Sequence, residues 1–284
     1  FTMVGKTIKK WWPIFVLPTL AAFIIGFLWP FIWGIYLSFC KFTTVQDVTF
    51  VGFSNYQKIL LDNTFSHAFW LTVIFAFISS ILINVLAFAI ALALTKGFKG
   101  TNAFRTVFFM PNLIGGIVLG YIWQTLLNGL LSKWGQPLLA LSAKNGFIGM
   151  LILLCWQQIG YMMIIYIAGI QNIPGELIEA AKIDGANSWQ LLRYVTLPML
   201  MPTITICTFL TLTNGFKLFD QNFALTGGNP AKMSQLLALN IYDTMYGTTG
   251  WQGVGQAKAV IFFILVAVIA LIQNKLTTSK EVQD

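Results

Sequence analysis

The most polar sustained segment of this 284-residue chain is EAAKIDGANSWQLLRYVTLP, residues 179–198. It combines Glu179, Lys182, Asp184 and Gly185 between two long apolar stretches. Acidic and basic side chains at this spacing are suited to binding a polar surface of a partner. The sequence shows no His, Asp or Cys constellation of the kind that an enzyme site needs. The segment therefore indicates a contact site rather than a catalytic one.

A short amphipathic helix is predicted at the start of this region. Pro174 suits the first helical turn, and Glu176 and Glu179 favour the positive end of the helix. On a helical wheel Glu176, Glu179 and Lys182 share one third of the circumference, while apolar residues occupy much of the rest. The helix is therefore expected to expose one charged face.

A glycine corner and a second helix are predicted to follow. Gly185 can end the first helix in a left-handed cap, and either Asn187 or Ser188 can cap the second helix. Pro198 then opens the next apolar run. The pattern predicts two short helices joined by a tight corner.

Two interpretations of this helix pair remain open. It could lie on the inner leaflet of a membrane, as many amphipathic segments do. Glu176, Glu179 and Asp184 would then face anionic headgroups, near which basic residues are preferred. A protein partner with a basic or polar cleft explains the acidic face better.

The rest of the chain has the composition of a membrane protein. Hydrophobic residues make up 57% of it and charged residues 9%, with a mean hydropathy of +0.76. A helix needs about 20 apolar residues to cross about 30 Å of hydrocarbon. We therefore predict an all-α polytopic membrane protein with six transmembrane helices and a cytoplasmic helix-turn-helix loop. The six runs are Ile14–Phe39, Phe69–Leu94, Thr106–Leu127, Phe147–Ile170, Pro198–Phe216 and Ala259–Gln273.

Lysine and arginine near the helix ends predict the orientation, because cytoplasmic loops carry an excess of them. The expected cytoplasmic residues are Lys6, Lys9, Lys10, Lys96, Lys99, Arg105, Lys182, Arg193, Lys275 and Lys280. Six spans then place both termini in the cytoplasm. A net charge of +8 suits an anionic inner leaflet and needs no nucleic acid to explain it.

The energy source is expected to lie outside this chain. The sequence contains no G-x-x-x-x-G-K-[ST] phosphate loop, so an ATPase activity of its own is not predicted. The six runs contain no Asp, Glu, Lys, Arg or His, whereas ion-coupled carriers usually hold such groups inside the membrane. An ion-coupled carrier or channel is therefore the weaker alternative, and a membrane-embedded enzyme is a third.

Neutral amides and aromatic rings near the middle of the chain could bind a sugar, which needs hydrogen bonds and flat apolar faces. The alternative is that the amides bond neighbouring helices and the rings form an interfacial belt. The candidate path comprises Trp123, Gln124, Asn128, Trp156, Gln157, Tyr161, Asn214, Phe216, Phe219 and Asp220.

The polar segment resembles a known family motif. Glu179-Ala180-Ala181, then Gly185, then Val195-Thr196-Leu197-Pro198 is similar to the EAA loop in permease subunits of bacterial ATP-binding-cassette (ABC) importers. The family has isoleucine at the position of Val195. IPGELIEAAKIDGA and FDQNFALTGGNP resemble the branch that imports carbohydrates, although Asn229 stands where a third glycine is usual.

This resemblance implies a function for the whole chain, residues 1–284, as a single transmembrane domain. The chain would be a permease subunit that moves a sugar or oligosaccharide from a binding protein into the cytoplasm of a bacterium. Residues 171–198 would be the loop that couples it to an ATPase. The coupling residues implied are Glu179, Ala180, Ala181, Asp184, Gly185, Leu197 and Pro198.

The resemblance also implies the other components of the transporter. They are a cytoplasmic ABC ATPase dimer, a second six-helix permease subunit and an extracellular or periplasmic sugar-binding protein. The second permease is expected to be a similar but distinct chain. ATP and Mg would be bound by the ATPase subunits, and no cofactor or metal is expected in this chain.

Overall fold

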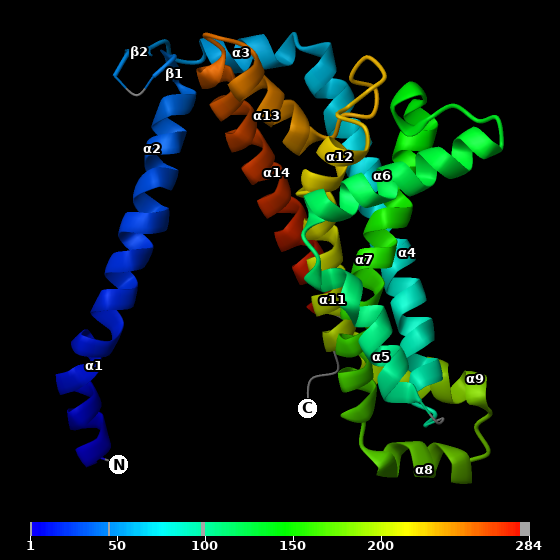
Figure 1. The fold of residues 1–284 in the computed structure, drawn as a ribbon. Helices are drawn as coiled ribbons and strands as arrows, with labels where there is room; N and C mark the ends of the chain where they lie inside the picture. The colour runs from blue at the N-terminus through cyan, green and yellow to red at the C-terminus, as the bar shows by residue number, and fades with distance from the viewer. Residues whose placement is uncertain (1, 45, 98–99, 279–284) are drawn as a thin grey trace. The chain divides into compact units, whose positions relative to one another are not determined.

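The computed structural model describes residues 2–44, 46–97 and 100–278 (Figure 1). Lys99 and Lys280, which contributed to the predicted orientation, lie outside the described residues. Packing contacts group the chain into two compact units, Phe1–Asp62 with Ile241–Ile261, and Asn63–Asn240 with Phe262–Asp284. Each unit is described by itself.

The first unit begins with a long apolar helix. It comprises α1 (Thr2–Phe23), a π-helical turn η1 (Ile24–Leu28) and α2 (Trp29–Ser38). The π turn ends two residues before Pro30, whose ring and missing N–H disrupt the regular hydrogen-bond ladder of the preceding turn. A hairpin of β1 (Cys40–Phe42) and β2 (Val48–Phe50) follows, with Cys40 opposite Phe50, and then α3 (Ser54–Leu60).

Two further helices begin in one unit and end in the other, α13 (Leu237–Gly247) and α14 (Gln252–Thr278). Helix α14 starts seven residues before the predicted run at Ala259, and it therefore contains Lys258. This side chain is 1% exposed, and its Nζ lies 2.7 Å from Asp62 Oδ2 and 2.8 Å from Thr244 Oγ1. The predicted run stopped short of this lysine. The helix can include it because the ion pair with Asp62 compensates its buried charge.

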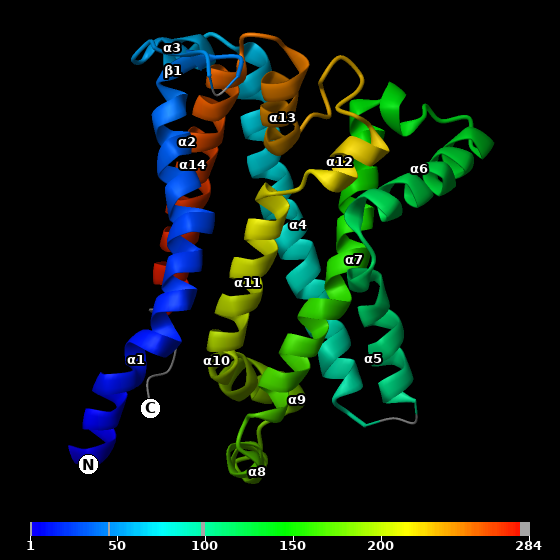
Figure 2. The ribbon, with the colours of Figure 1, turned by 60° about the vertical axis from the view of Figure 1, so that its left-hand side comes forward.

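The second unit is a helical bundle built around α7 (Ala143–Gln171). Helix α7 packs against α4 (Asn63–Leu94) and α11 (Met201–Phe216), and these two also pack against each other (Figure 2). Small residues permit close contact: a Cβ on Gly215 of α11 would lie 2.9 Å from Ala76 Cα of α4. The buried core residues include Phe75, Ile83, Met150, Leu153 and Tyr166.

Shorter elements join these helices. Between α4 and α7 lie α5 (Thr101–Phe109), the 3₁₀ turn η2 (Met110–Leu113), α6 (Gly116–Lys133) and the 3₁₀ turn η3 (Leu139–Leu141). Between α7 and α11 lie α8 (Gly175–Ile183), α9 (Ser188–Leu191), the π turn η4 (Leu192–Thr196) and α10 (Leu197–Met199). After α11 comes α12 (Asp220–Leu225).

The third and fifth predicted spans are not straight helices. Residues Thr101–Leu113 and Gly116–Lys133 meet at 103°, and Ser188–Met199 and Met201–Phe216 meet at 70°. Pro111, Gly115 and Gly116 surround the first break, and Pro198 and Pro202 flank the second. Proline lacks an N–H and glycine is a poor helix former, so both sequences favour a break. The predicted third and fifth runs therefore each correspond to a bent pair of helices.

Four described helices are long and apolar enough to cross a membrane, and the number rises to six if each bent pair is one span. The four are Trp11–Ser38, Asn63–Leu94, Ala143–Gln171 and Gln252–Thr278. They contain the first, second, fourth and sixth predicted runs, except that Phe39 falls just beyond α2. The all-α polytopic fold predicted from the sequence is confirmed.

The ion pair of Lys258 yields a prediction about stability. Lys258→Met leaves the largely buried carboxylate of Asp62 without its cation, and we expect the free energy of unfolding to fall by about 3 kcal/mol. SDS titration of the purified protein in detergent measures this. The double variant Lys258→Met/Asp62→Asn, which removes both charges, is expected to recover most of the loss. A single variant as stable as the unchanged protein would contradict a stabilising role of the pair.

Candidate functional site

The predicted helix pair is present as α8 and α9, and Gly185 forms the corner between them. Gly185 has φ +79°, the left-handed conformation that glycine adopts without strain. Its N–H donates to the Lys182 carbonyl at 3.1 Å, and the Ala186 N–H donates to the Ala181 carbonyl at 2.9 Å. These two bonds form a Schellman motif, which satisfies the last carbonyl groups of α8. The predicted glycine cap is confirmed.

Asn187, rather than Ser188, caps the second helix. Its side-chain oxygen accepts from the N–H groups of Trp189 at 3.1 Å and Gln190 at 2.9 Å, and Gln190 Oε1 accepts from the Asn187 N–H at 2.8 Å. This reciprocal capping box fixes the start of α9. The spacing Asn-x-x-Gln was the signal in the sequence that identifies it.

The helix pair exposes both charged and large apolar groups. Glu179, Asp184 and Gly185 are exposed, while Leu197 and Pro198 are half-buried where the pair joins α10. Of the two alanines, Ala180 is exposed and Ala181 half-buried. Ile183 is 85% exposed and Trp189 65% exposed. In the second unit the pair lies at the end of the bundle where α4 and α7 both finish (Figure 1).

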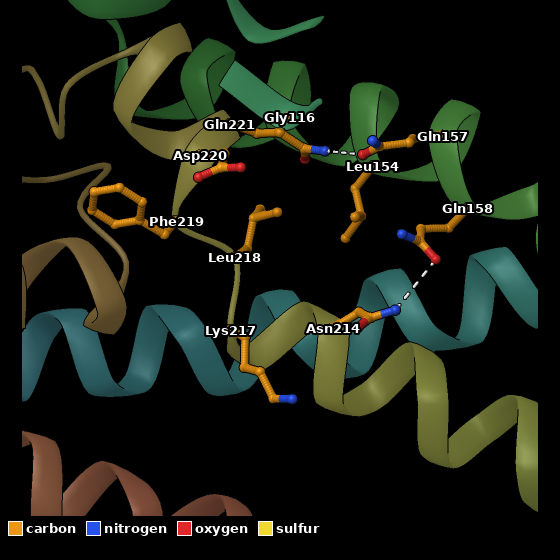
Figure 3. A pocket seen from close by; sticks show the side chains of 10 residues that line it. All are labelled: Gly116, Leu154, Gln157, Gln158, Asn214, Lys217, Leu218, Phe219, Asp220 and Gln221. Atoms are coloured by element: carbon orange, nitrogen blue, oxygen red, sulfur yellow. Dashed lines mark hydrogen bonds between the residues drawn. The ribbon is translucent and has the colours of Figure 1, made fainter. Parts of the chain in front are cut away.

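A second site is a polar cavity of about 250 Å³ in the second unit (Figure 3). Its walls come from the start of α6, the middle of α7, the end of α11 and the start of α12. The lining residues are Gly116, Leu154, Gln157, Gln158, Asn214, Lys217, Leu218, Phe219, Asp220 and Gln221.

Side-chain amides organise this polar cavity. Gln157 Nε2 donates to the Ile114 carbonyl at 3.1 Å, at the break between η2 and α6. Gln221 Nε2 donates in turn to Gln157 Oε1, and Asn214 Nδ2 donates to Gln158 Oε1 at 3.3 Å (Figure 3). The bend of the third span thus supplies the carbonyl group that orients the first of these amides.

Two glycines of α6 let α12 approach closely. A Cβ on Gly116 would lie 2.8 Å from the Asp220 side chain, and a Cβ on Gly120 would meet Ala224 Cβ. Gln124 of α6 also donates to the Leu225 carbonyl at 3.0 Å. Helix α12 therefore packs closely against α6, and its first two residues, Asp220 and Gln221, line the cavity.

Four of the ten predicted path residues line the polar cavity: Gln157, Asn214, Phe219 and Asp220. The other six have structural contacts elsewhere. Besides Gln124, Asn128 Oδ1 accepts from the Leu139 N–H at 2.9 Å, and Phe216 is 1% exposed in a hydrophobic cluster. The ring centroids of Trp123 and Trp156 are 5.2 Å apart, and those of Tyr161 and Phe109 are 6.4 Å apart. The contacts of Gln124 and Asn128 match the alternative interpretation of the amides, and a role of the six residues in a path stays a prediction.

Sequence reasoning missed Gln221 and Gly116. Gln221 follows Asp220 directly, but the apolar runs do not indicate the short helix α12, on which Gln221 lies at the cavity wall. Gly116 belongs to a glycine pair inside an apolar run, and that pair was the available signal of a break.

Comparisons with known proteins agree with this architecture. Residues 84–279 match the family described as binding-protein-dependent transport system inner membrane component. The chain is 43% identical to a probable starch degradation products transport system permease protein, AmyD, of Thermoanaerobacterium thermosulfurigenes, over 96% of both chains. It is 32% identical to the multiple sugar-binding transport system permease protein MsmF of Streptococcus mutans, over 98% of this chain and 99% of that protein.

A solved structure has the same fold. A chain of a bacterial ABC transporter involved in the import of the acidic polysaccharide alginate superimposes with a TM-score of 0.82 at 22% identity. The match covers 98% of this chain and 99% of that chain. The protein therefore belongs to the family of inner membrane components of binding-protein-dependent transport systems. It is a multi-pass protein of the plasma membrane.

The corner at Gly185 yields a prediction about local order. Gly185→Ala places a Cβ on a residue with positive φ, which costs about 1 kcal/mol in strain although no neighbour lies within 4 Å. We expect faster hydrogen exchange in residues 183–191 with unchanged membrane insertion. Gly175→Ala is the matched control, because Gly175 also has open space but no positive φ. Equal exchange in both variants would contradict the role of the corner.

Proposed function

We propose that this chain is a membrane-spanning permease subunit of an ATP-driven importer, and that the importer moves a sugar or oligosaccharide from a binding protein into the cytoplasm. The observation that carries the proposal is family membership over most of the chain, together with relatives named for starch products and multiple sugars. The polar cavity supplies the site at which such a cargo would be held during passage.

The polar cavity suits a neutral, hydroxyl-rich cargo. Gln157, Gln158, Asn214 and Gln221 offer amide donors and acceptors without net charge. The two charged groups in the lining, on Lys217 and Asp220, have opposite signs and leave the lining neutral overall. Sugar hydroxyls donate and accept hydrogen bonds, as amides do. They therefore match this lining better than a cargo with a net negative or positive charge would.

Energy would enter through α8 and α9. A capped, rigid corner transmits a push without flexing, and its exposed acidic and apolar groups suit a groove on a protein partner. Glu179 and Gly185 are the residues assigned here to the contact with an ABC ATPase dimer, which would bind ATP and Mg. This chain would carry no ATPase activity of its own.

The orientation and the remaining partners complete the proposal. Both termini and the pair α8–α9 would lie in the cytoplasm of a bacterium, and the binding protein would deliver cargo from the other side. A second six-helix permease subunit, similar but distinct, would complete the path. A solved alginate ABC transporter in complex with a pentasaccharide-bound periplasmic protein has a chain with this fold, at a TM-score of 0.75.

One argument against an ion-coupled carrier changes once the position of Lys258 is known. Lys258 lies inside α14, so the absence of ionisable groups from the spans no longer argues against an ion-coupled carrier. Its pairing with Asp62 and Thr244 is that of a packed, satisfied group rather than of an open relay. Family membership therefore favours the ATP-driven importer.

Charge reversal on α8 tests the proposal. Glu179→Lys places a positive charge where the acidic face would meet the ATPase, and we expect loss of most of the ATPase that co-purifies with the tagged chain. Quantitative mass spectrometry of the gently solubilised complex measures this. Lys144→Glu, a reversal at an exposed residue at the start of α7, is the control and should leave recovery unchanged.

The outcomes separate the two functions. Recovery of an ATPase with a phosphate-binding loop and of a second six-helix protein by the unchanged chain supports the importer. Recovery of the chain alone would favour the carrier or channel over the importer. Equal ATPase recovery with Glu179→Lys would refute docking through α8.

A further inference from the structure

One face of α14 begins against the core and ends beside a groove. Residues spaced three or four apart form this face, which is the spacing of one side of a helix. Four apolar members pack against the buried cluster that contains Leu212: Phe262, Leu265, Val266 and Ile269. The next positions on the same face, Ile272, Gln273 and Leu276, line an apolar groove of about 440 Å³. Proteins are close-packed beside their cores, so a further group must complete the packing along this part of α14.

The apolar groove lies at the depth of the hydrocarbon. Its walls come from α4, α11 and α14, all within the second unit. Leu212 of α11 is buried at its floor, whereas Ile81 of α4 and Leu276 of α14 are 63% and 61% exposed at its rim. Phe77 and Ile81 stand near the middle of α4, and α4 and α14 are both long and apolar enough to cross a membrane. The groove therefore opens to the interior of the bilayer.

The polar side chains in the walls of the apolar groove are bonded to the protein. Ser80 Oγ lies 2.8 Å from Thr211 Oγ1. Gln273 Nε2 donates to the Thr205 carbonyl and to Thr277 Oγ1, both at 3.3 Å, and Thr277 Oγ1 donates to the Gln273 carbonyl at 2.8 Å. These bonds leave a lining whose accessible surface is hydrocarbon. An apolar occupant fits it better than a polar one.

The rim of the apolar groove suits a flexible chain rather than a helix. Helices in a membrane pack through small residues that let their backbones approach, as Gly215 does against Ala76. The rim instead carries large side chains, those of Phe77, Ile81 and Leu276. A helix is a rigid cylinder about 10 Å across and cannot pass between such side chains, whereas an acyl chain can bend to follow them.

A positive charge marks one end of the apolar groove. The groove reaches Leu276 and Thr277, close to the last described residue of α14, and Lys275 is exposed in the same turn. A lysine at the end of a membrane helix extends its ammonium group to the surface of the bilayer, where lipid phosphates lie. The groove and this charge together match the two parts of a phospholipid.

We propose that the apolar groove binds one acyl chain of a phospholipid, and that the phosphate of this lipid lies at the end of α14 beside Lys275. The acyl chain completes the packing of α14 against α4 and α11. This inference goes beyond the proposed function and does not depend on it, because it requires only that the chain spans a membrane.

Photo-crosslinking tests the proposal. The tagged protein, with every subunit that accompanies it, carries Phe77→p-benzoylphenylalanine and is reconstituted in vesicles of equal phosphatidylglycerol and phosphatidylcholine. It is then extracted in mild detergent, washed and irradiated, and peptides are analysed by mass spectrometry. The matched control carries the same group at Val85, which is exposed on α4 but does not line the groove. We expect about 10-fold more phospholipid adduct at residue 77, because each buried methylene group strengthens retention.

Two further variants, each combined with the probe at residue 77, test the position of the lipid. Thr208→Phe adds a ring within the groove and should abolish most of the adduct. Lys275→Glu should lower the ratio of phosphatidylglycerol to phosphatidylcholine in the adduct about 5-fold, since a basic residue near the surface favours an anionic headgroup. Lys144→Glu reverses an exposed charge on α7, outside the groove, and should leave this ratio unchanged.

The possible results distinguish a bound lipid from other occupants. Equal adduct at residues 77 and 85 overturns the inference, whether or not the further variants fold. A polypeptide in place of a phospholipid on residue 77 also overturns it, because a protein partner then covers the groove. Undiminished adduct in Thr208→Phe places the lipid outside the groove, and an unchanged headgroup ratio in Lys275→Glu refutes the position of the phosphate.

Discussion

The fold and the candidate site both depend on one constraint, which is that backbone groups freed by a break in an apolar environment must find partners inside the protein. The break between η2 and α6 frees the Ile114 carbonyl, and Gln157 of α7 satisfies it. This single bond joins the bent third span to the central helix and orients the amide that holds Gln221. The polar cavity is thus a consequence of how the bend is satisfied. Glycines 116 and 120 contribute by allowing α12 to lie close to α6.

The same requirement shapes the other site in a different way. The ends of α8 and α9 need partners for their free carbonyl and N–H groups, and the corner supplies them locally through the Schellman motif at Gly185 and the capping box at Asn187. Because these bonds lie within the corner itself, its shape does not rely on packing against the bundle. A corner of this kind can expose Glu179 and Trp189 to a partner and still hold its geometry when it is pushed. Cap chemistry therefore gives the proposed coupling element its stiffness.

Local patterns in the sequence predicted the helix pair correctly, because caps are short-range features: Gly185 and Asn187 act on residues only two to five positions away. Long apolar runs likewise predicted the four continuous membrane helices. The runs did not predict the two bends, since hydropathy does not register the loss of hydrogen bonds at Pro111 or Pro202. They also excluded Lys258, whose charge is tolerated through Asp62, 196 residues away in the chain. The position of Gln221 in the cavity wall also depends on long-range contacts. The sequence alone does not reveal such contacts, and six of the ten predicted path residues do not line the cavity.

We propose that this chain forms the membrane path of an importer powered by ATP hydrolysis in another subunit. The most direct measurement is uptake of labelled maltotriose into proteoliposomes that contain the complex purified through this chain, with binding protein outside and either ATP or a non-hydrolysable analogue inside. We expect uptake that requires both ATP hydrolysis and the binding protein and that persists when ion gradients are collapsed. Uptake by the chain without any ATPase, driven by an ion gradient, would contradict it.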